Sequence, residues 1–201
     1  YQPGQHVYRA GDPSRSLFAV RSGALKSYCT TEDGDEQVLG FTLPGEIVGL
    51  DGMSDGAYAS SSIALETASV CEMPYDGLED LCQSLPGLNR QMMRVVSKEI
   101  TTDQGMLLLL GKRTAEERLA AFLLSLSSRY ESRGLSKMTF NLPMSRQDIG
   151  NYLGLAIETV SRLFASFQKH GLLTVNRREI IILDIKRLHA MVEGCAGSSK
   201  L

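Results

Sequence analysis

The sequence contains no apolar run long enough to cross a membrane. A membrane-spanning helix needs about 20 consecutive apolar residues, whereas apolar runs here, such as Met106–Leu110, are far shorter. No signal peptide is visible, so a cytoplasmic protein is expected. The chain opens on Tyr1 rather than on Met, which leaves open whether further residues precede it.

Residues suited to acid–base or metal chemistry are few and scattered. The three histidines are His6, His170 and His189, and no Ser/His/Asp set or pair of carboxylates suggests an active site. We therefore expect a protein that is not an enzyme.

The four cysteines have no C-x-x-C spacing of the kind seen in zinc sites and redox pairs. They are Cys29, Cys71, Cys82 and Cys195. Because thiols rarely form disulfides in a reducing compartment, these residues are expected to be buried thiols.

Charge is distributed unevenly along the chain. Residues 1–110 carry 7 Lys and Arg against 15 Asp and Glu, a net charge of −8, and residues 111–201 carry 14 against 8, a net charge of +6; together these give −2. An acidic first half followed by a basic second half is typical of a sensor or partner domain joined to a nucleic-acid-binding domain.

The stretch Met144–Gly171 predicts two short helices joined by a tight turn. Ser145 and Asp148 have the spacing of a capping box at the start of the first helix. Gly154 supplies the left-handed backbone position that a helix-turn-helix corner usually needs. The second helix is expected over about residues 156–170 and ends before Gly171.

The second helix has one apolar face and one polar face. The apolar positions recur at three- and four-residue spacing and are expected to pack inward: Ile157, Val160, Leu163, Phe164 and Phe167. The opposite stripe contains Glu158, Ser161, Arg162, Ala165 and Lys169. Arg can donate to guanine O6 and N7, and Glu can accept from an exocyclic amine. An ordinary amphipathic surface helix is the alternative interpretation.

A β-hairpin is predicted after this helix. Residues 172–183 alternate and are rich in β-branched side chains, with Asn176, Arg177 and Arg178 at the centre. This pattern is typical of the wing of a winged helix-turn-helix domain. Residues expected beside DNA phosphates, which position a protein without specifying sequence, are Arg146, Thr159, Lys169, Arg177 and Arg178. Simple solvation of two arginines at a turn is the alternative for Arg177 and Arg178.

The first 73 residues predict a small β-sandwich or jelly roll. Glycines separate short apolar stretches at regular intervals. The candidate strands cover residues 6–9, 17–21, 24–29, 36–42, 63–65 and 68–73, with an acidic hairpin tip at residues 32–35.

A short helix over residues 75–83 and a longer one from Pro86 to about Leu110 are expected next. The longer helix carries apolar positions at alternating spacings of 3 and 4, the heptad pattern of a helix–helix interface. We call these positions the seam: Met93, Val96, Ile100, Asp103, Leu107 and Leu110. Packing of this helix on its own β domain is the alternative. Residues 111–113 are expected to form a hinge, and Thr114 with Glu117 to cap the following helix.

Taken together, these segments resemble the CRP/FNR family of bacterial transcription regulators, and most of all its FNR-type, oxygen-responsive branch. The resemblance extends over LFAVRSGALKSY, GDEQVLGF, PGEIVGLDGM, ALETASVCEMP, QMMRVVSKEI, AEERLAAFL and SRQDIGNYLGLAIETVSRLF. It implies an α+β fold with three parts: a β-roll sensor domain over residues 1–84, a dimerisation helix over residues 85–110, and a winged helix-turn-helix domain over residues 111–201. The β-roll would be a jelly roll like that of cyclic-nucleotide-binding domains.

The resemblance also implies a function. The E-x-x-S-R pattern of Glu158, Ser161 and Arg162 is similar to the base-contacting residues on the recognition helix of FNR-type regulators. By that similarity a homodimer would read an inverted repeat of a TTGAT-like half-site and would recruit or block RNA polymerase.

Two departures from the family pattern affect the expected ligands. Gly45-Glu46 is present, but residues 58–62 contain no Arg to meet a phosphate, and a buried phosphate without a cation or an amide nest is costly. No cyclic nucleotide is therefore expected, and Gly45-Glu46 is interpreted as turn chemistry.

FNR-type proteins hold a [4Fe-4S] cluster with three N-terminal cysteines and one in the β domain. Cys71 matches the β-domain position, whereas the N-terminal trio is absent from this chain. Because such clusters normally need four thiolates, a cluster is not expected on this chain alone and is expected only in a longer, complete protein. A β domain that senses haem, nitric oxide or another small ligand is the alternative, and a purely structural Cys71 is a further one.

Overall fold

The computed structural model describes residues 1–193, and the chain divides into two compact units, Tyr1–Gly105 and Met106–Leu201. Each unit has its own core. The predicted three-part division at residues 84 and 110 stays a prediction, since the two units meet within one helix. Among the described residues, no helix combines the length and the apolarity needed to cross a membrane.

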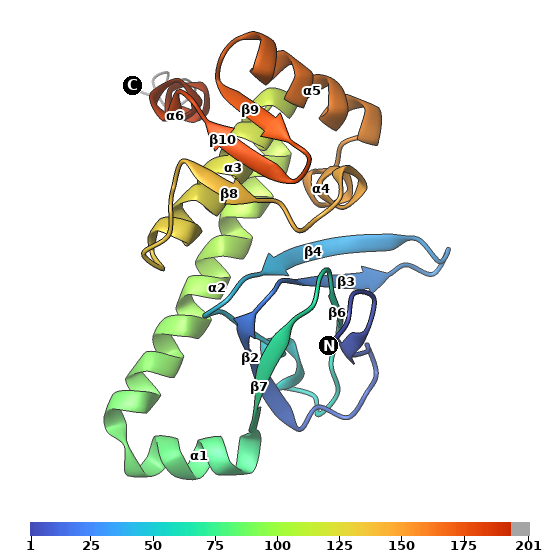
Figure 1. The fold of residues 1–201 in the computed structure, drawn as a ribbon. Helices are drawn as coiled ribbons and strands as arrows, with labels where there is room; N and C mark the ends of the chain where they lie inside the picture. The colour runs from blue at the N-terminus through green and yellow to red at the C-terminus, as the bar shows by residue number, and fades with distance from the viewer. Residues whose placement is uncertain (194–201) are drawn as a thin grey trace, which may run out of the picture. The chain divides into compact units, whose positions relative to one another are not determined.

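Two antiparallel sheets form the β-roll of the first unit (Figure 1). The order in the larger sheet is β1-β6-β3-β4 and in the smaller sheet β5-β2-β7. The strands are β1 His6–Tyr8, β2 Ser16–Ser22, β3 Leu25–Thr30, β4 Glu36–Thr42, β5 Ile47–Val48, β6 Ser61–Ala64 and β7 Ser69–Pro74, with a short 3-10 helix η1 at Leu50–Gly52. The predicted jelly roll is confirmed. The sequence pattern missed β5, because a strand of 2 residues is too short to show alternation.

Three aromatic rings fill the interior of the roll. The Tyr8 ring stacks on Tyr58 with centroids 4.0 Å apart and on Phe18 at 5.9 Å. Tyr58 donates its hydroxyl to the Ser16 carbonyl oxygen at 2.7 Å, and burial raises the pKa of the Tyr8 hydroxyl well above its ordinary value. Stacked rings and satisfied hydroxyls make this a packed core.

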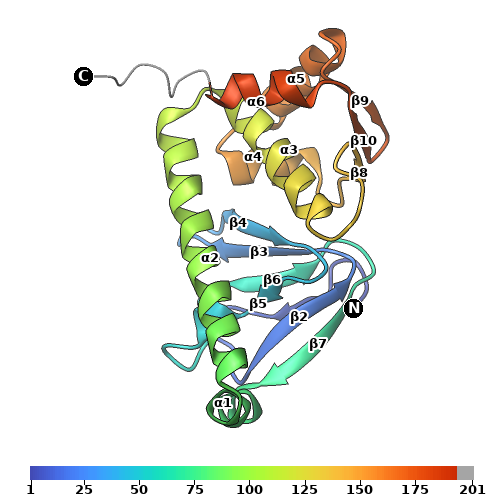
Figure 2. The ribbon, with the colours of Figure 1, turned by 90° about the vertical axis from the view of Figure 1, so that its left-hand side faces the viewer.

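Two helices follow the roll: α1 Tyr75–Ser84 and α2 Pro86–Lys112 (Figure 2). The hinge predicted at residues 111–113 is wrong in its first two positions, because α2 continues without a break through Lys112. The Arg113 amide still donates to the Leu109 carbonyl at 3.2 Å. The Leu110 carbonyl in this last turn also accepts a hydrogen bond from Arg118, and the Arg113 carbonyl directly after the helix accepts another. These hydrogen bonds offset the helix cost of Gly111.

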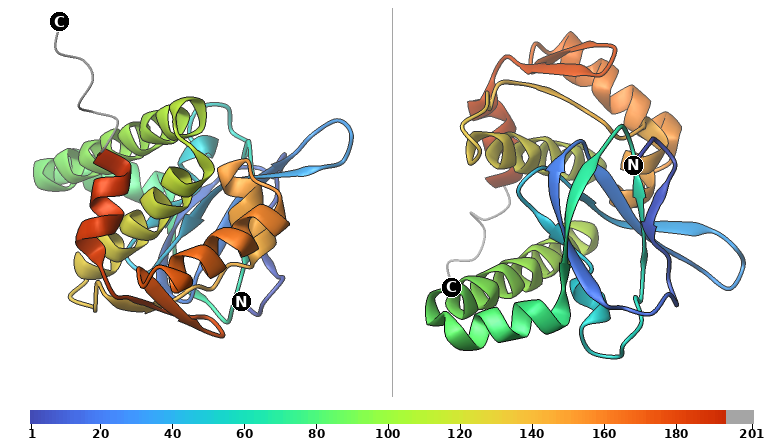
Figure 3. Two further views of the ribbon diagram at one scale, coloured as in Figure 1. Left: turned by 90° about the horizontal axis from the view of Figure 1, so that it is seen from above. Right: turned by 60° about the horizontal axis from the view of Figure 1, so that its bottom comes forward.

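The second unit is a winged helix-turn-helix domain, as predicted (Figure 1). Its elements are α3 Ala115–Glu131, β8 Thr139–Asn141, α4 Arg146–Leu153, α5 Ile157–Lys169, β9 Leu173–Asn176, β10 Glu179–Ile182 and α6 Ile185–Glu193. Helix α3 packs against α5 and α6 (Figure 3). Strand β8 adds a third strand to the wing, in the order β8-β10-β9. The sequence pattern missed β8, which is only 3 residues long.

Candidate nucleic-acid interface

Reciprocal hydrogen bonds fix the start of α4. The Ser145 hydroxyl accepts from the Asp148 amide at 3.0 Å, and the Asp148 carboxylate accepts from the Ser145 amide at 3.0 Å. The predicted capping box is therefore confirmed, as is the corresponding Thr114–Glu117 box at the start of α3. Both boxes satisfy amides that the first helical turn leaves without partners.

Two glycines shape the turn between α4 and α5. Gly154 has φ 64° and ends α4 in the left-handed conformation, as predicted. Gly150 is required for a different reason: a β-carbon there would lie 2.6 Å from the Leu155 carbonyl oxygen. The close approach at Gly150 sets how sharply α5 leaves the turn.

Helix α5 presents the predicted polar stripe to solvent. Glu158, Ser161, Arg162, Ala165 and Lys169 are all exposed, while Val160, Leu163, Phe164 and Phe167 are buried. The prediction that Ile157 packs inward is wrong, because its side chain is 41% exposed. Ile157 is the first residue of α5, and at the end of a helix fewer neighbours cover a side chain.

We call the exposed residues Glu158, Ser161, Arg162, Ala165 and Lys169 the reading stripe. A hydrogen bond fixes the orientation of Arg162, the residue at its centre. The Arg162 guanidinium donates to the Thr159 hydroxyl at 3.2 Å. This neutral contact orients the guanidinium without neutralising its charge, so its other donors stay available for a base edge. Glu158 lies in the first turn of the same helix.

Arg146, the first residue of α4, is half-buried, and its guanidinium lies 3.4 Å from the centre of the Phe164 ring. Burial lowers the pKa of this guanidinium from its ordinary value, but an arginine stays charged at neutral pH. The stacked ring therefore holds one of the predicted phosphate-binding cations in place.

The wing is attached directly to the recognition helix. The Val175 amide of β9 donates to the Gln168 side chain of α5 at 3.0 Å. At the end of α5, Leu172 and Gly171 donate to the Phe167 and Gln168 carbonyls at 2.9 and 3.0 Å. Gly171 has φ 68°, so this is a Schellman cap with glycine at the left-handed position. Sequence reasoning missed Gln168, because its partner lies on another element.

The wing turn consists of Arg177 and Arg178, between the paired residues Asn176 and Glu179. Both arginines are exposed, and within residues 1–193 neither side chain has a hydrogen-bonding or ionic partner. Arg177 has φ 55° and is the only non-glycine residue with positive φ in the described part of the chain. A two-residue hairpin turn favours glycine at such a position. The tip of the wing therefore has a strained backbone at a positively charged residue.

Arg177→Gly is expected to stabilise the domain and to weaken DNA binding. Relief of the left-handed strain should raise the free energy of unfolding by about 1 kcal/mol. Loss of a phosphate contact should weaken binding to all sequences alike. It should also reduce the slope of the logarithm of the binding constant against the logarithm of the salt concentration by about one unit. Thermal unfolding and titrations at several salt concentrations measure both effects. Arg178→Gly is the control, since it removes the same charge without relieving strain; a salt slope that Arg177→Gly leaves unchanged contradicts the phosphate contact.

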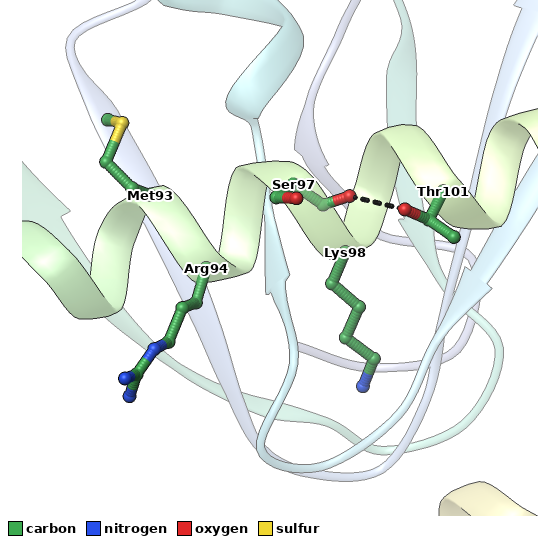
Figure 4. Close-up of a pocket in the computed structure, with 5 residues that line it drawn as sticks. All are labelled: Met93, Arg94, Ser97, Lys98 and Thr101. Atoms are coloured by element: carbon green, nitrogen blue, oxygen red, sulfur yellow. Dashed lines mark hydrogen bonds between the residues drawn. The ribbon is translucent and has the colours of Figure 1, made fainter.

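The seam on α2 is largely open to solvent. Met93, Ile100 and Leu107 are 61%, 53% and 72% exposed; Asp103 is exposed too, and Val96 and Leu110 are half-buried. A shallow hollow beside the seam is lined by Met93, Arg94, Ser97, Lys98 and Thr101 (Figure 4). All five lining residues belong to α2, so the hollow is part of the helix surface.

The cysteines are more accessible than predicted. Cys71 is exposed on β7, and Cys29 and Cys82 are half-buried, whereas Cys195 lies outside the described residues. The expectation of a buried thiol is therefore wrong for Cys71, because β7 is an edge strand of its sheet. Within residues 1–193, no three His, Cys, Asp or Glu side chains gather into a group that could hold a metal ion.

Gly45-Glu46 forms a turn. The Glu46 carboxylate accepts from the Leu43 amide at 2.8 Å, and Gly45 has φ 83°. The interpretation of this pair as turn chemistry is thus supported by its own hydrogen bonding. Absence of cyclic nucleotide binding stays a prediction.

A β-roll, a long helix and a winged helix-turn-helix domain with an exposed reading stripe define a DNA-binding transcription regulator. Residues 1–85 match the cyclic nucleotide-binding domain, and residues 117–191 match the Crp-like helix-turn-helix domain. The first of these matches describes the fold of the roll.

Two named proteins and one solved structure are similar to this chain over most of its length. The chain is 53% identical over 191 residues to the transcriptional activator protein anr of Pseudomonas aeruginosa, covering 95% of this chain and 78% of that protein. It is 53% identical over 181 residues to the fumarate and nitrate reduction regulatory protein of Escherichia coli K12, covering 90% and 72%. The structure of FixK2 from Bradyrhizobium japonicum superposes with a TM-score of 0.87 at 32% identity, covering 95% and 94%. The chain belongs to the CRP/FNR family and is a DNA-binding regulator of the FNR type.

Proposed function

We propose that the protein acts as a homodimer that reads an inverted repeat of a TTGAT-like half-site. The observation that carries this proposal is the exposed stripe of Glu158, Ser161 and Arg162 on α5. Arg is suited to guanine and Glu to an exocyclic amine. Small residues on the same stripe allow the helix to enter a major groove.

Phosphate contacts on both sides of α5 position the helix. Thr159 lies in the first turn of α5, and Arg146 on α4 lies over the Phe164 ring in the middle of α5. Lys169 lies in the last turn of α5, and Arg177 and Arg178 lie on the wing. Such contacts fix register on the duplex without selecting a sequence. Bound at a promoter, the dimer would recruit or block RNA polymerase.

A binding titration tests this assignment. Fluorescence anisotropy at fixed salt should show tighter binding to a labelled duplex with a TTGAT inverted repeat than to a scrambled duplex of the same composition, by roughly a thousandfold or more. Equal affinity for the two duplexes would refute the proposed function.

The seam on α2 is proposed as the dimer contact. Its exposed apolar positions would be covered by the same positions of a second copy in a two-fold arrangement. In that arrangement two Asp103 carboxylates would face each other between layers of Ile100 and Leu107. Like charges so placed repel, which keeps the dimer marginal and open to regulation.

Asp103→Ala is therefore expected to tighten the dimer. Removal of the paired carboxylates should lower the dimer dissociation constant by roughly tenfold, which corresponds to about 1.4 kcal/mol, and should make DNA binding insensitive to air. Sedimentation equilibrium measures the dimer constant. Glu99→Ala removes a carboxylate from α2 outside the seam and should leave that constant unchanged. An unchanged constant in Asp103→Ala would place Asp103 away from the contact.

Response to oxygen or redox state is proposed for the β-roll. The described residues do not form a four-thiolate site, so they do not fit an iron–sulfur cluster by themselves. Cys71 is exposed and able to supply one thiolate, and the other three would have to come from outside residues 1–193. The absorption spectrum of anaerobically purified protein distinguishes a cluster, a haem and neither.

Cys71→Ser is expected to abolish any difference in DNA binding between anaerobic and air-exposed protein. Cys29→Ser, Cys82→Ser and Cys195→Ser are expected to retain that difference. Paired titrations before and after exposure to air provide the measurement. The same loss in Cys29→Ser or Cys82→Ser would show that Cys71 has no special role.

A further inference from the structure

One arginine joins the end of the long helix to the helix-turn-helix. Arg118, in the first turn of α3, is half-buried and donates three hydrogen bonds to main-chain carbonyls. Its Nη2 donates to Leu110 at 2.7 Å, its Nε to Arg113 at 3.0 Å and its Nη1 to Leu153 at 3.0 Å. We call this set of contacts the Arg118 bridge.

Two of the three acceptors lie at helix ends. Leu110 is in the last turn of α2, and Leu153 is the last residue of α4. The last four carbonyls of a helix have no partner within that helix, and they lie at the negative end of the helix dipole. The planar guanidinium can satisfy both ends at once, in directions set by its rigid fork.

Side-chain packing at the same point supports the bridge. A β-carbon at Gly154 would lie 3.5 Å from Arg118 Nη1 and 3.8 Å from Leu110 Cδ2. The guanidinium and the Leu110 side chain therefore lie directly against the turn that aims α5. Leu110 is also the last position of the seam, so one residue takes part in both the proposed dimer contact and the bridge.

We propose that Arg118 is the positioning residue that fixes the angle between the end of α2 and the recognition helix, and thereby the half-site spacing that a dimer accepts. The inference rests on the proposed function, since it requires a dimer formed through α2 and an inverted repeat. No base contact is assigned to Arg118. It acts on the placement of α4 and α5.

Spacing is the property that such a bridge controls. One extra base pair between half-sites moves the second site by about 3.4 Å and rotates it by about 35°. A rigid dimer cannot follow that change without strain or loss of contacts. A dimer whose helix-turn-helix is released from α2 can follow it at a lower cost.

Duplexes with TTGAT inverted repeats and spacers shortened or lengthened by one base pair test the proposal. The wild-type protein is expected to lose roughly tenfold or more in affinity when the spacer departs from its optimum, as for one mismatched base pair. Arg118→Met is expected to lose less than about threefold relative to its own best spacer. Because each variant is compared with itself, a uniform loss of affinity does not affect the readout.

Arg118→Lys provides a second variant in case Arg118→Met does not fold. A lysine keeps the charge, but its ammonium is a compact point charge and lacks the planar fork that spans three carbonyls, so it should also relax the spacing preference. Arg113→Met is the matched control. It removes a cation from the same junction, one that pairs with Glu117 at 3.3 Å, and leaves the Arg118 bridge intact. Its spacing preference should equal that of the wild type.

The outcomes separate the two proposals. If the wild-type protein shows no preference for the inverted repeat, the proposed function fails and the inference fails with it. If the wild type prefers one spacer, and folded Arg118→Lys or Arg118→Met discriminates between spacers as strongly, the inference alone is overturned. Relaxed spacing in the Arg118 variants, with the wild-type preference kept in Arg113→Met, supports it.

Discussion

Arg162→Ala should abolish discrimination between a TTGAT inverted repeat and a scrambled duplex while leaving the fold intact. The side chain is exposed on α5, and its one hydrogen bond to the described part of the chain is the contact with Thr159, so its removal leaves no cavity. Loss of a bidentate contact to guanine costs about 1–3 kcal/mol. A dimer loses that contact in both half-sites, so the total loss in affinity is expected to be about 10²-fold or more.

Anisotropy titrations at fixed salt measure the effect, and thermal unfolding checks the fold. Lys186→Ala is the control because it removes one positive charge from α6, outside the proposed interface. That variant should retain the preference for the inverted repeat. Unchanged specificity in Arg162→Ala would remove Arg162 from the base-reading set.

Gly150→Ala is expected to disrupt the helix-turn-helix. The added methyl group would meet the Leu155 carbonyl oxygen at 2.6 Å, and a main-chain oxygen in a tight turn cannot move as a flexible side chain can. Insertion of a methyl group into a well-packed site costs about 1–3 kcal/mol and sometimes more. The turn must open in response, and α5 then no longer has the direction that the reading stripe requires.

Chemical denaturation and DNA titration together measure this change. The matched control is Gly77→Ala in α1, which makes the same substitution in a helix where nothing beyond the local helix backbone and the adjacent residues lies within 4 Å of the added carbon. Because alanine is the better helix former, the control should gain about 0.5–1 kcal/mol. Equal stability of the two variants would show that the turn tolerates a side chain at Gly150.

Local signals in the sequence predicted the helix-turn-helix well. The Ser145–Asp148 box, the left-handed Gly154 and the polar stripe on α5 each depend on residues within a few positions of one another. The wing was predictable for the same reason. Alternation around Asn176 and Arg177 indicated both strands and the turn.

Long-range contacts were not predictable from one sequence. Arg118 reaches Leu153 across 35 positions, and neither spacing nor composition indicates that pairing. The hinge prediction failed in its first two positions for a related reason: Gly111 suggests a break, while the hydrogen bond from Arg118 to the Leu110 carbonyl stabilises the helix end. The exposure of Cys71 depends on β7 being an edge strand, which only the strand order reveals.

The packed aromatic interior of the roll has a consequence for how a signal could enter the protein. Tyr8, Phe18 and Tyr58 stack together inside the roll, so a small molecule from solvent meets the exposed side chains on the rim of the roll before it meets these rings. Cys71 is on that rim, four residues before the start of α1 at Tyr75. The Tyr75 hydroxyl donates to the Gly49 carbonyl at 3.2 Å, and its amide donates to Arg15 at 3.0 Å. Tyr75 therefore ties the first residue of α1 to the roll through both its side chain and its main chain, so the end of β7 and the start of α1 are held at one place.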